Sequence, residues 1–333
     1  MGLYSEMAGP KARGINVAFD SSVCFVAPMS APDFFDRQRR IPGWDQDLIS
    51  RQVCLCLGAG GLGSSVILGL SRLGVRRIHV VDFDVVEVHN LNRQVLYSHA
   101  SVGKSKAEQA TAEASRVHAM ETEIVSHNWD VREHWPEVVT LAQECHVIFN
   151  MIDIGDQFDV VVQALALTLK LPLVQGGTFR TSLNLETFSS HGVPCLWCAN
   201  PNVGNEFIEK CKPGETALAL RDLSFIQADD HPTGASTVFV ALTAGQMMVA
   251  NWTNLLFYEQ QQQILKLGGK LPEEVQERPP PFTRIFMYLD NMDIDKFMIE
   301  PEVGCLLCPG KPKPEPTLQG EGGAPGSVSP VVV

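Results

Sequence analysis

The chain has 333 residues, 45% of them hydrophobic and 19% charged, with a formal net charge of −12. This composition can fill the core of a large domain, whereas the acidic balance argues against nonspecific binding to nucleic acid. The first residues show no charged segment followed by an apolar one, and the longest apolar stretches are interrupted by polar residues. We therefore expect a cytoplasmic protein without a membrane span.

Residues 1–33 show few periodic signals and are expected to form an N-terminal extension. From about residue 52 to 175, strand and helix patterns alternate, which predicts an α/β fold with a Rossmann-like, doubly wound and mainly parallel sheet. The predicted strands are Val53–Leu57, Arg77–Val81, Glu123–Val125, Val147–Ile152 and Pro172–Val174, and the predicted helices include Ser64–Leu70, Lys104–His118 and Val131–Glu144. Two later segments, Leu183–Ser189 and Thr283–Leu289, are expected to extend the sheet with antiparallel strands.

A glycine-rich loop, Gly58-Ala-Gly-Gly-Leu-Gly63, joins the first predicted strand to the first long helix. We expect glycine at Gly58, Gly60 and Gly63 because the turn requires positive φ and a close approach of phosphate and helix. Asp82 ends the next strand, where a carboxylate can accept ribose hydroxyls. These features predict a nucleotide site and leave an NAD-dependent oxidoreductase open.

Amide and cationic side chains follow at Asn90, Arg93, Gln94 and Lys106. Arginine can bind two phosphate oxygens and lysine supplies a point charge, which suits a triphosphate better than a dinucleotide. Any one of these residues alone is better explained by a solvated turn with an asparagine cap. Their combination predicts an ATP site.

Two Cys-x-x-Cys clips supply four thiols, from Cys195, Cys198, Cys305 and Cys308. Four sulfurs in two clips suit a closed tetrahedral zinc site, which is structural because no coordination position stays open. Redox disulfides are the alternative. A zinc site would tie the C-terminal segment back onto the domain.

With these motifs, the chain resembles the adenylating superfamily of ThiF, MoeB and HesA, which includes the ubiquitin-activating enzymes. The resemblance covers about residues 34–308 and rests on Phe35-Asp-Arg-Gln38, on GAGGLG, and on DFDVVEVHNLNRQ followed by VGKSK. It implies an ATP-dependent adenylyltransferase that acts as a homodimer on the C-terminal carboxylate of a ubiquitin-like or sulfur-carrier protein ending in Gly-Gly, or of a peptide. The alternative is a catalytically silent scaffold subunit with the same fold.

The resemblance also implies individual roles. Gly58, Gly60, Gly61 and Gly63 would form the nucleotide loop, Asp82 would bind ribose, Asn90, Arg93, Gln94 and Lys106 would bind the phosphates, Arg37 would reach into the partner's site, and Asp153 would hold Mg²⁺. The family usually has Asp-Asn where this chain reads Asp153-Ile-Gly-Asp156, so Asp156 remains an alternative acidic group.

The segment of about residues 200–230 is expected to cross over the active site as a loop, and residues 309–333 to form a disordered tail. Activating relatives place a catalytic cysteine where this chain has none, near Asp229. Cys211 is the one candidate nucleophile, since its flanking lysines could favour the thiolate. An exposed, idle thiol in a mobile loop is the preferred interpretation of Cys211.

Overall fold

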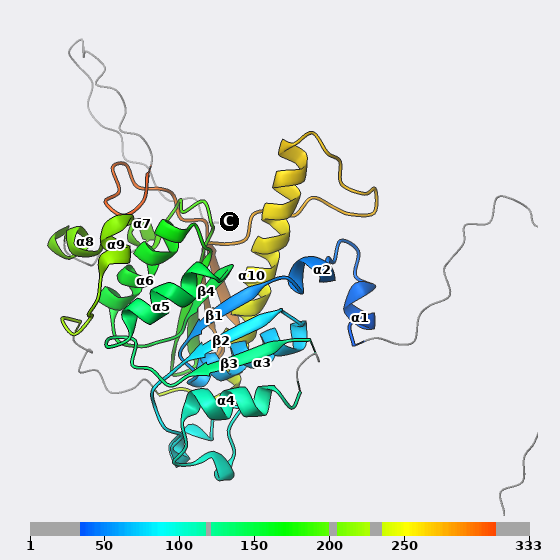
Figure 1. Cartoon of the computed structure of the whole chain (residues 1–333). Helices are drawn as coiled ribbons and strands as arrows, with labels where there is room; N and C mark the ends of the chain where they lie inside the picture. The colour runs from blue at the N-terminus through cyan, green and yellow to red at the C-terminus, as the bar shows by residue number, and fades with distance from the viewer. Residues whose placement is uncertain (1–33, 118–120, 200–204, 227–234, 311–333) are drawn as a thin grey trace, which may run out of the picture.

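The computed structural model describes residues 34–117, 121–199, 205–226 and 235–310. The expected N-terminal extension and nearly all of the expected tail lie outside these ranges. Within them, an eight-stranded sheet has the order β3-β2-β1-β4-β5-β6-β7-β8 (Figure 1). Its strands are β1 Val53–Leu57, β2 Arg77–Val81, β3 Glu123–His127, β4 Val147–Asn150, β5 Leu173–Phe179, β6 Ser182–Phe188, β7 Arg284–Tyr288 and β8 Asp293–Phe297.

In this order the first five strands, β3, β2, β1, β4 and β5, are parallel. Strands β6, β7 and β8 continue the sheet in antiparallel pairing. The predicted α/β fold, with its parallel sheet extended by antiparallel strands, is confirmed. Strand β5 is longer than predicted because it pairs with β6 along its whole length, from Leu173 opposite Phe188 to Phe179 opposite Ser182. Strand β8 was not anticipated.

Helices cover both faces of the sheet and enclose two hydrophobic cores (Figure 1). Successive side chains of β1 point to opposite faces of the sheet, so Leu55 packs in the first core and Cys54 in the second. All of β1 is buried. Helices α3 (Gly61–Leu73), α4 (Lys106–Ala114) and α10 (Val238–Lys266) belong to the second core, where Phe149 packs edge-on against Trp252. Helices α5 (Trp135–Gln143) and α6 (Asp156–Leu169) belong to the first.

The region predicted as a crossover loop contains two short helices, α8 (Asn205–Cys211) and α9 (Glu215–Ala219), which pack against α6. The described part of this segment is thus not irregular throughout, because Phe207, Ile208 and Ala217 bury apolar side chains in the first core. That the segment crosses over the active site stays a prediction. Residues 200–204 and 227–234 lie outside the described ranges.

Short elements complete the described chain: helices α1 (Asp36–Arg39), α2 (Gln46–Ile49) and α7 (Leu196–Ala199), and 3-10 turns at Val88–Asn90 and His99–Ser101. Among the described helices, none is long and apolar enough to cross a membrane.

Candidate nucleotide site and metal centre

A cavity of about 820 Å³ opens beside the carboxyl ends of the parallel strands. The sheet reverses its strand order between β1 and β4, and ligands of doubly wound sheets bind at such a point. One end of the cavity, here called the nucleotide end, is formed by Gly58, Asp82, Lys106 and their neighbours. The other, here called the distal end, is formed by the segment from Asp153 into the start of α6 and by strands β5, β6 and β7.

The glycine loop lies at the nucleotide end. Gly58 has φ +95°, and a Cβ there would lie 3.0 Å from the carbonyl oxygen of Met151. A Cβ on Gly63 would lie 2.2 Å from the carbonyl oxygen of Gly58, so this glycine lets α3 start close to the loop. Positive φ was also predicted at Gly60 and Gly63, which is wrong: Gly60 has φ −74° and Gly63 is helical. The first N–H groups of α3 are available to an anion.

The carboxylate of Asp82 is held by two backbone donors. Its Oδ2 accepts from the N–H of Ala59 at 2.7 Å, and its Oδ1 accepts from the N–H of Asp84 at 2.9 Å. Burial raises the pKa of the Asp82 carboxyl, and these hydrogen bonds and nearby Lys106 counteract part of that effect. Asp82 lines the cavity at the place expected for a ribose-binding carboxylate, at the end of the second strand.

Lys106 begins α4 and points its ammonium into the cavity wall. Its Nζ lies 2.7 Å from Oδ2 of Asp84, and the residue is 8% exposed. The hydroxyl of Tyr97 lies 2.7 Å from the carbonyl oxygen of Ala59 and 3.2 Å from that of Lys106, so Tyr97 joins this helix start to the glycine loop. Lys106 is therefore not a solvated surface lysine, which was the simpler interpretation of the sequence.

The other three predicted phosphate ligands differ in placement. Arg93 lines the cavity, and its Nη1 donates to the carbonyl oxygen of His89 and to Oδ1 of Asn92, each at 3.0 Å. Gln94 also lines the cavity, and its buried Oε1 has no hydrogen-bond partner among the described residues. Asn90 does not line it: 3% exposed, it accepts from the N–H of Glu87 at 2.9 Å. Asn90 is thus a local cap, the alternative weighed for this group.

Acidic side chains follow β4. Asp153 and Asp156 are exposed at the cavity wall, and one turn into α6 the half-buried Asp159 accepts from Nδ2 of Asn150 at 2.7 Å. Burial, reinforced by the charge of Glu186, raises the pKa of the Asp159 carboxyl to about 7. Exposed carboxylate oxygens at the wall of this cavity suit Mg²⁺, which keeps several waters and binds few carboxylates.

The strands of the distal end contribute residues that the sequence did not single out. Glu186 accepts two hydrogen bonds from Arg284, through Nε at 2.7 Å and through Nη2, and another from Nε2 of Gln175 at 2.8 Å. Arg284 also donates to the carbonyl oxygen of Ala199 at 3.2 Å. These side chains come from three strands, and only their register brings them together.

A second group missed by sequence reasoning follows β3, where Asp130 and Arg132 line the cavity and form an ion pair at 2.7 Å. Their position after a parallel strand, like that of Asp82, is the signal that could have identified them.

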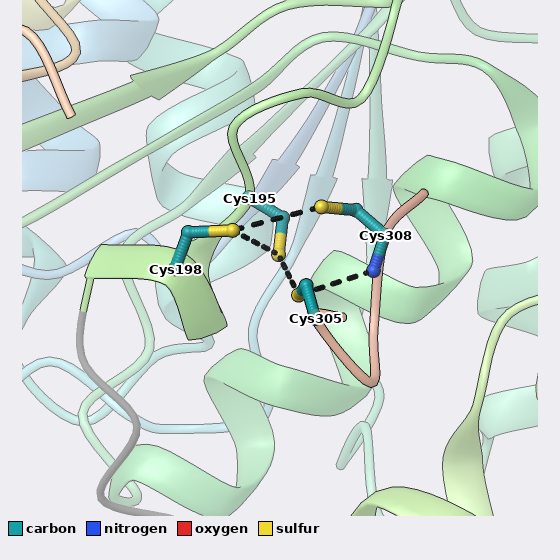
Figure 2. A group of neighbouring side chains, drawn as sticks. All are labelled: Cys195, Cys198, Cys305 and Cys308. Atoms are coloured by element: carbon teal, nitrogen blue, oxygen red, sulfur yellow. Dashed lines mark hydrogen bonds between the residues drawn. The ribbon is translucent and has the colours of Figure 1, made fainter. Parts of the chain in front are cut away.

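The four clip cysteines converge on one point, as Figure 2 shows. Their sulfurs all lie within 4.8 Å of one another, with 3.6 Å between Cys195 and Cys305, 3.6 Å between Cys198 and Cys308, and 3.8 Å between Cys195 and Cys198. All four are free thiols, so the disulfide alternative does not describe this structure. Tetrahedral zinc with Zn–S bonds of about 2.3 Å needs sulfurs roughly 3.8 Å apart, which fits this cluster.

Cys211 does not have the environment of a nucleophile or of an exposed loop thiol. It ends α8, is 0% exposed, and its S–H donates to the carbonyl oxygen of Phe207 at 3.4 Å. Burial raises the pKa of the Cys211 thiol to about 12. Lys210 and Lys212 flank it but do not offset the loss of water around the sulfur, so the predicted activation is wrong for this structure.

Arg37 is an exposed residue of α1 and does not line the cavity of its own chain. Of the predicted site residues, the structure thus gathers Gly58, Gly60, Gly61, Asp82, Arg93, Gln94, Lys106 and Asp153 around one cavity, and it leaves Gly63, Asn90, Cys211 and Arg37 outside.

A doubly wound sheet with a glycine loop, a ribose-type carboxylate and a buried lysine defines a nucleotide-binding α/β protein. Comparison with known proteins makes this class specific. The chain belongs to the ThiF family, which it matches over residues 35–276.

Among curated relatives, the chain is 30% identical over 166 residues to adenylyltransferase and sulfurtransferase MOCS3 of Aedes aegypti, a match that covers 46% of this chain and 34% of the relative. It is 27% identical over 244 residues to MOCS3 of Anopheles gambiae, covering 70% and 52%. The chain thus spans about half or less of the length of these relatives.

Among solved structures, E. coli MccB with ATP superposes with a TM-score of 0.57 at 18% identity, covering 79% of this chain and 68% of MccB. E. coli MccB bound to MccA-N7isoASN gives a TM-score of 0.58 at 18% identity, covering 79% and 69%. This likeness concerns the fold.

Proposed function

We propose that the protein is an ATP-dependent adenylyltransferase that activates the C-terminal carboxylate of a ubiquitin-like or sulfur-carrier protein, or of a peptide, and releases pyrophosphate. The observation that carries the proposal is the cavity in which Asp82, Arg93 and Lys106 surround the glycine loop. A silent scaffold has no need of cations placed around a nucleotide cavity. The family, and relatives named as adenylyltransferases, support the same reaction.

In the proposed reaction, an oxygen of the acceptor carboxylate attacks the α-phosphorus of ATP. The bond from that phosphorus to the oxygen bridging the α- and β-phosphates breaks, so the products are an acyl-adenylate and pyrophosphate. The carboxylate is already ionised at neutral pH, and no general base is required. The protein contributes positioning and electrostatic stabilisation.

The roles follow from the geometry of the nucleotide end. Asp82, fixed by two backbone N–H groups, accepts the ribose hydroxyls. Lys106 and Arg93 stabilise negative charge on the phosphates, and the amide of Gln94 supplies a further polar contact. Lys106 is held by Asp84 before nucleotide arrives, so its side-chain entropy is lost on folding and not on binding.

Mg²⁺ would be held by Asp153, with Asp156 as the alternative carboxylate, and would neutralise phosphate charge. Zn²⁺ would be held by the four clip cysteines in a structural role. A homodimer in which Arg37 of one protomer reaches the other's site belongs to the same proposal. Later transfer of the acyl group to a thiol would use a thiol other than Cys211. The cytoplasmic location remains a prediction.

The test is ATP–pyrophosphate exchange with the full chain, Mg²⁺, and a panel of small carrier proteins and peptides ending in Gly-Gly. Exchange that depends on one panel member supports the proposal and identifies the acceptor class. Binding of ATP without exchange for any acceptor contradicts it and favours the scaffold.

A further inference from the structure

The charges along the cavity wall are unevenly distributed. At the nucleotide end, acidic groups have basic neighbours: Asp84 pairs with Lys106 and Asp130 pairs with Arg132. The described residues that line the distal end include the acids Asp153, Asp156, Asp159 and Glu186 and a single cation, Arg284. Even with Mg²⁺ at Asp153, the distal end therefore keeps an excess of carboxyl groups.

The one cation among the described residues of the distal end, Arg284, is already paired with a carboxylate. Arg284 directs Nε and Nη2 to Oε1 of Glu186, which is 6% exposed, and Nη1 to the carbonyl oxygen of Ala199. Each of its three nitrogens therefore donates to the protein, and the charges of Arg284 and Glu186 largely offset each other. Asp159 has no ion-pair partner among the described residues, and its carboxylate accepts a hydrogen bond from Nδ2 of Asn150.

Gln175 provides an independent observation. It lines the cavity and is 5% exposed, and its Nε2 is fixed on Oε2 of Glu186 at 2.8 Å. Its Oε1 is buried and accepts no hydrogen bond from any described residue. A buried acceptor without a donor is destabilising, so this oxygen suits a ligand that donates an N–H.

The same sheet face continues outward from the cavity. In the register of β7 and β8, Phe286 lies opposite Asp295 and Tyr288 lies opposite Asp293. Phe286 lines the cavity, and directly paired residues share a face, so both aspartates lie on the cavity side of the sheet. A chain that leaves the distal end over β7 and β8 passes two further carboxylates.

We infer that the acceptor carries a cationic side chain, lysine or arginine, within a few residues of the carboxylate that is adenylated, and that Asp159 and Gln175 receive its N–H donors. The inference rests on the proposed function and narrows its substrate class. Acceptors with an acidic residue at that place would be disfavoured, because a carboxylate there faces Asp159, while Arg284 is already paired with Glu186.

The test compares three fluorescein-labelled pentapeptides, Ala-Xaa-Ala-Gly-Gly with Xaa arginine, norleucine or glutamate, by anisotropy with the full chain, Mg²⁺ and a non-hydrolysable ATP analogue. Norleucine keeps the length of the side chain without its charge. We expect the arginine peptide to bind at least tenfold more tightly than the glutamate peptide, with norleucine between them, and the difference to shrink as salt is added.

Variant Asp159→Asn, which keeps the hydrogen bond from Asn150, should lower the arginine-to-glutamate ratio at least threefold. Glu108→Gln, which removes one charge from the exposed start of α4, is the matched control and should leave the ratio unchanged. Gln175→Leu should weaken binding of the arginine peptide, but this peptide should still bind more tightly than the glutamate peptide.

Equal binding of the three peptides, no binding of any, or an unchanged ratio in Asp159→Asn overturns the inference. Pyrophosphate exchange with the same peptides distinguishes a failure of this inference from a failure of the proposed function. Charge preference without exchange contradicts adenylation and leaves the cationic preference standing. Exchange at equal rates for the arginine and glutamate peptides supports adenylation and contradicts the preference for a cationic acceptor.

Discussion

Nη1 of Arg284 donates a hydrogen bond to the carbonyl oxygen of Ala199, 3.2 Å away. Ala199 follows Cys198 at the end of α7, and Arg284 lines the cavity. One side chain therefore joins the cysteine cluster to the distal end of the cavity. Loss of zinc from the cluster should destabilise the fold and also disturb the proposed acceptor site.

Substitution Cys195→Ser is expected to remove zinc and lower the melting temperature, by on the order of 5 °C or more, because a closed metal site contributes directly to folding stability. Metal analysis of the wild type should find about one zinc per chain. Since the carbonyl of Ala199 orients Arg284, the variant should also raise the KM for the acceptor more than the KM for ATP. Cys145→Ser is the control for a buried cysteine outside the cluster. A wild type that is folded and free of metal would contradict the zinc assignment.

Substitution Lys106→Ala should lower pyrophosphate exchange by about 10²-fold or more, since it removes a cation from a partly desolvated site and leaves Asp84 without its partner. Lys104→Ala is the control, because Lys104 is an exposed lysine two positions away. Exchange rates and ATP binding would be measured for both variants. Equal exchange by Lys106→Ala and Lys104→Ala would remove Lys106 from the proposed machinery.

Asp159 should make stability depend on pH in an unusual direction. Its pKa is about 7 in the folded chain against an ordinary value of 3.8, so the native state binds more protons than the unfolded state between those values. The stabilisation present below pH 4 is lost as pH rises towards 7 and stays lost above it. Asp159→Asn should therefore stabilise the chain at pH 8, on the order of 1–3 kcal/mol, and have little effect at pH 4. Chemical denaturation at both pH values measures this, and an equal effect at both would show that the carboxyl is ionised throughout.

The thiol of Cys211 should resist alkylation in the folded protein. Burial in the first core and a pKa of about 12 leave little thiolate at neutral pH. Mass spectrometry after iodoacetamide treatment should find Cys211 unmodified until denaturant is added, and Cys211→Ala should retain pyrophosphate exchange. Rapid alkylation of the native chain, or loss of acyl transfer with exchange preserved in Cys211→Ala, would restore this cysteine as the nucleophile.

The sequence predicted the parts of the fold and site that depend on local patterns. Strand β1 is apolar throughout and is followed by the glycine loop, so its role was visible without a structure, as was the carboxylate of Asp82 after β2. Strand β8 was missed because all its residues are exposed and Asp293–Phe297 has no apolar run. The distal end was missed because Gln175, Glu186 and Arg284 meet through strand register, which a single sequence does not encode.

Local contacts explain why Asn90 and Cys211 differ from their predicted roles. The side chain of Asn90 turns back onto the N–H of Glu87, and an asparagine in a polar loop can equally cap a turn or face a ligand. Cys211 lies between lysines in a polar segment, but one helical face of α8 packs into the core. Periodicity over so short a helix is too weak a signal to place that face in advance.

The proposed role of Arg37 predicts complementation between two inactive variants. Arg37→Ala leaves the cavity of its own chain intact, and Lys106→Ala leaves Arg37 intact. If Arg37 acts across a homodimer, a mixed dimer of the two variants contains one complete site: the Lys106 of the first chain and the Arg37 of the second. Random pairing of equal amounts then gives about one quarter of wild-type exchange, while each variant alone stays near the background. Co-expression with two different tags, followed by tandem purification and exchange assay, isolates the mixed dimer. Recovery of about half the wild-type rate in that purified species supports action in trans, whereas a background rate, or sedimentation of the wild type as a monomer, contradicts it.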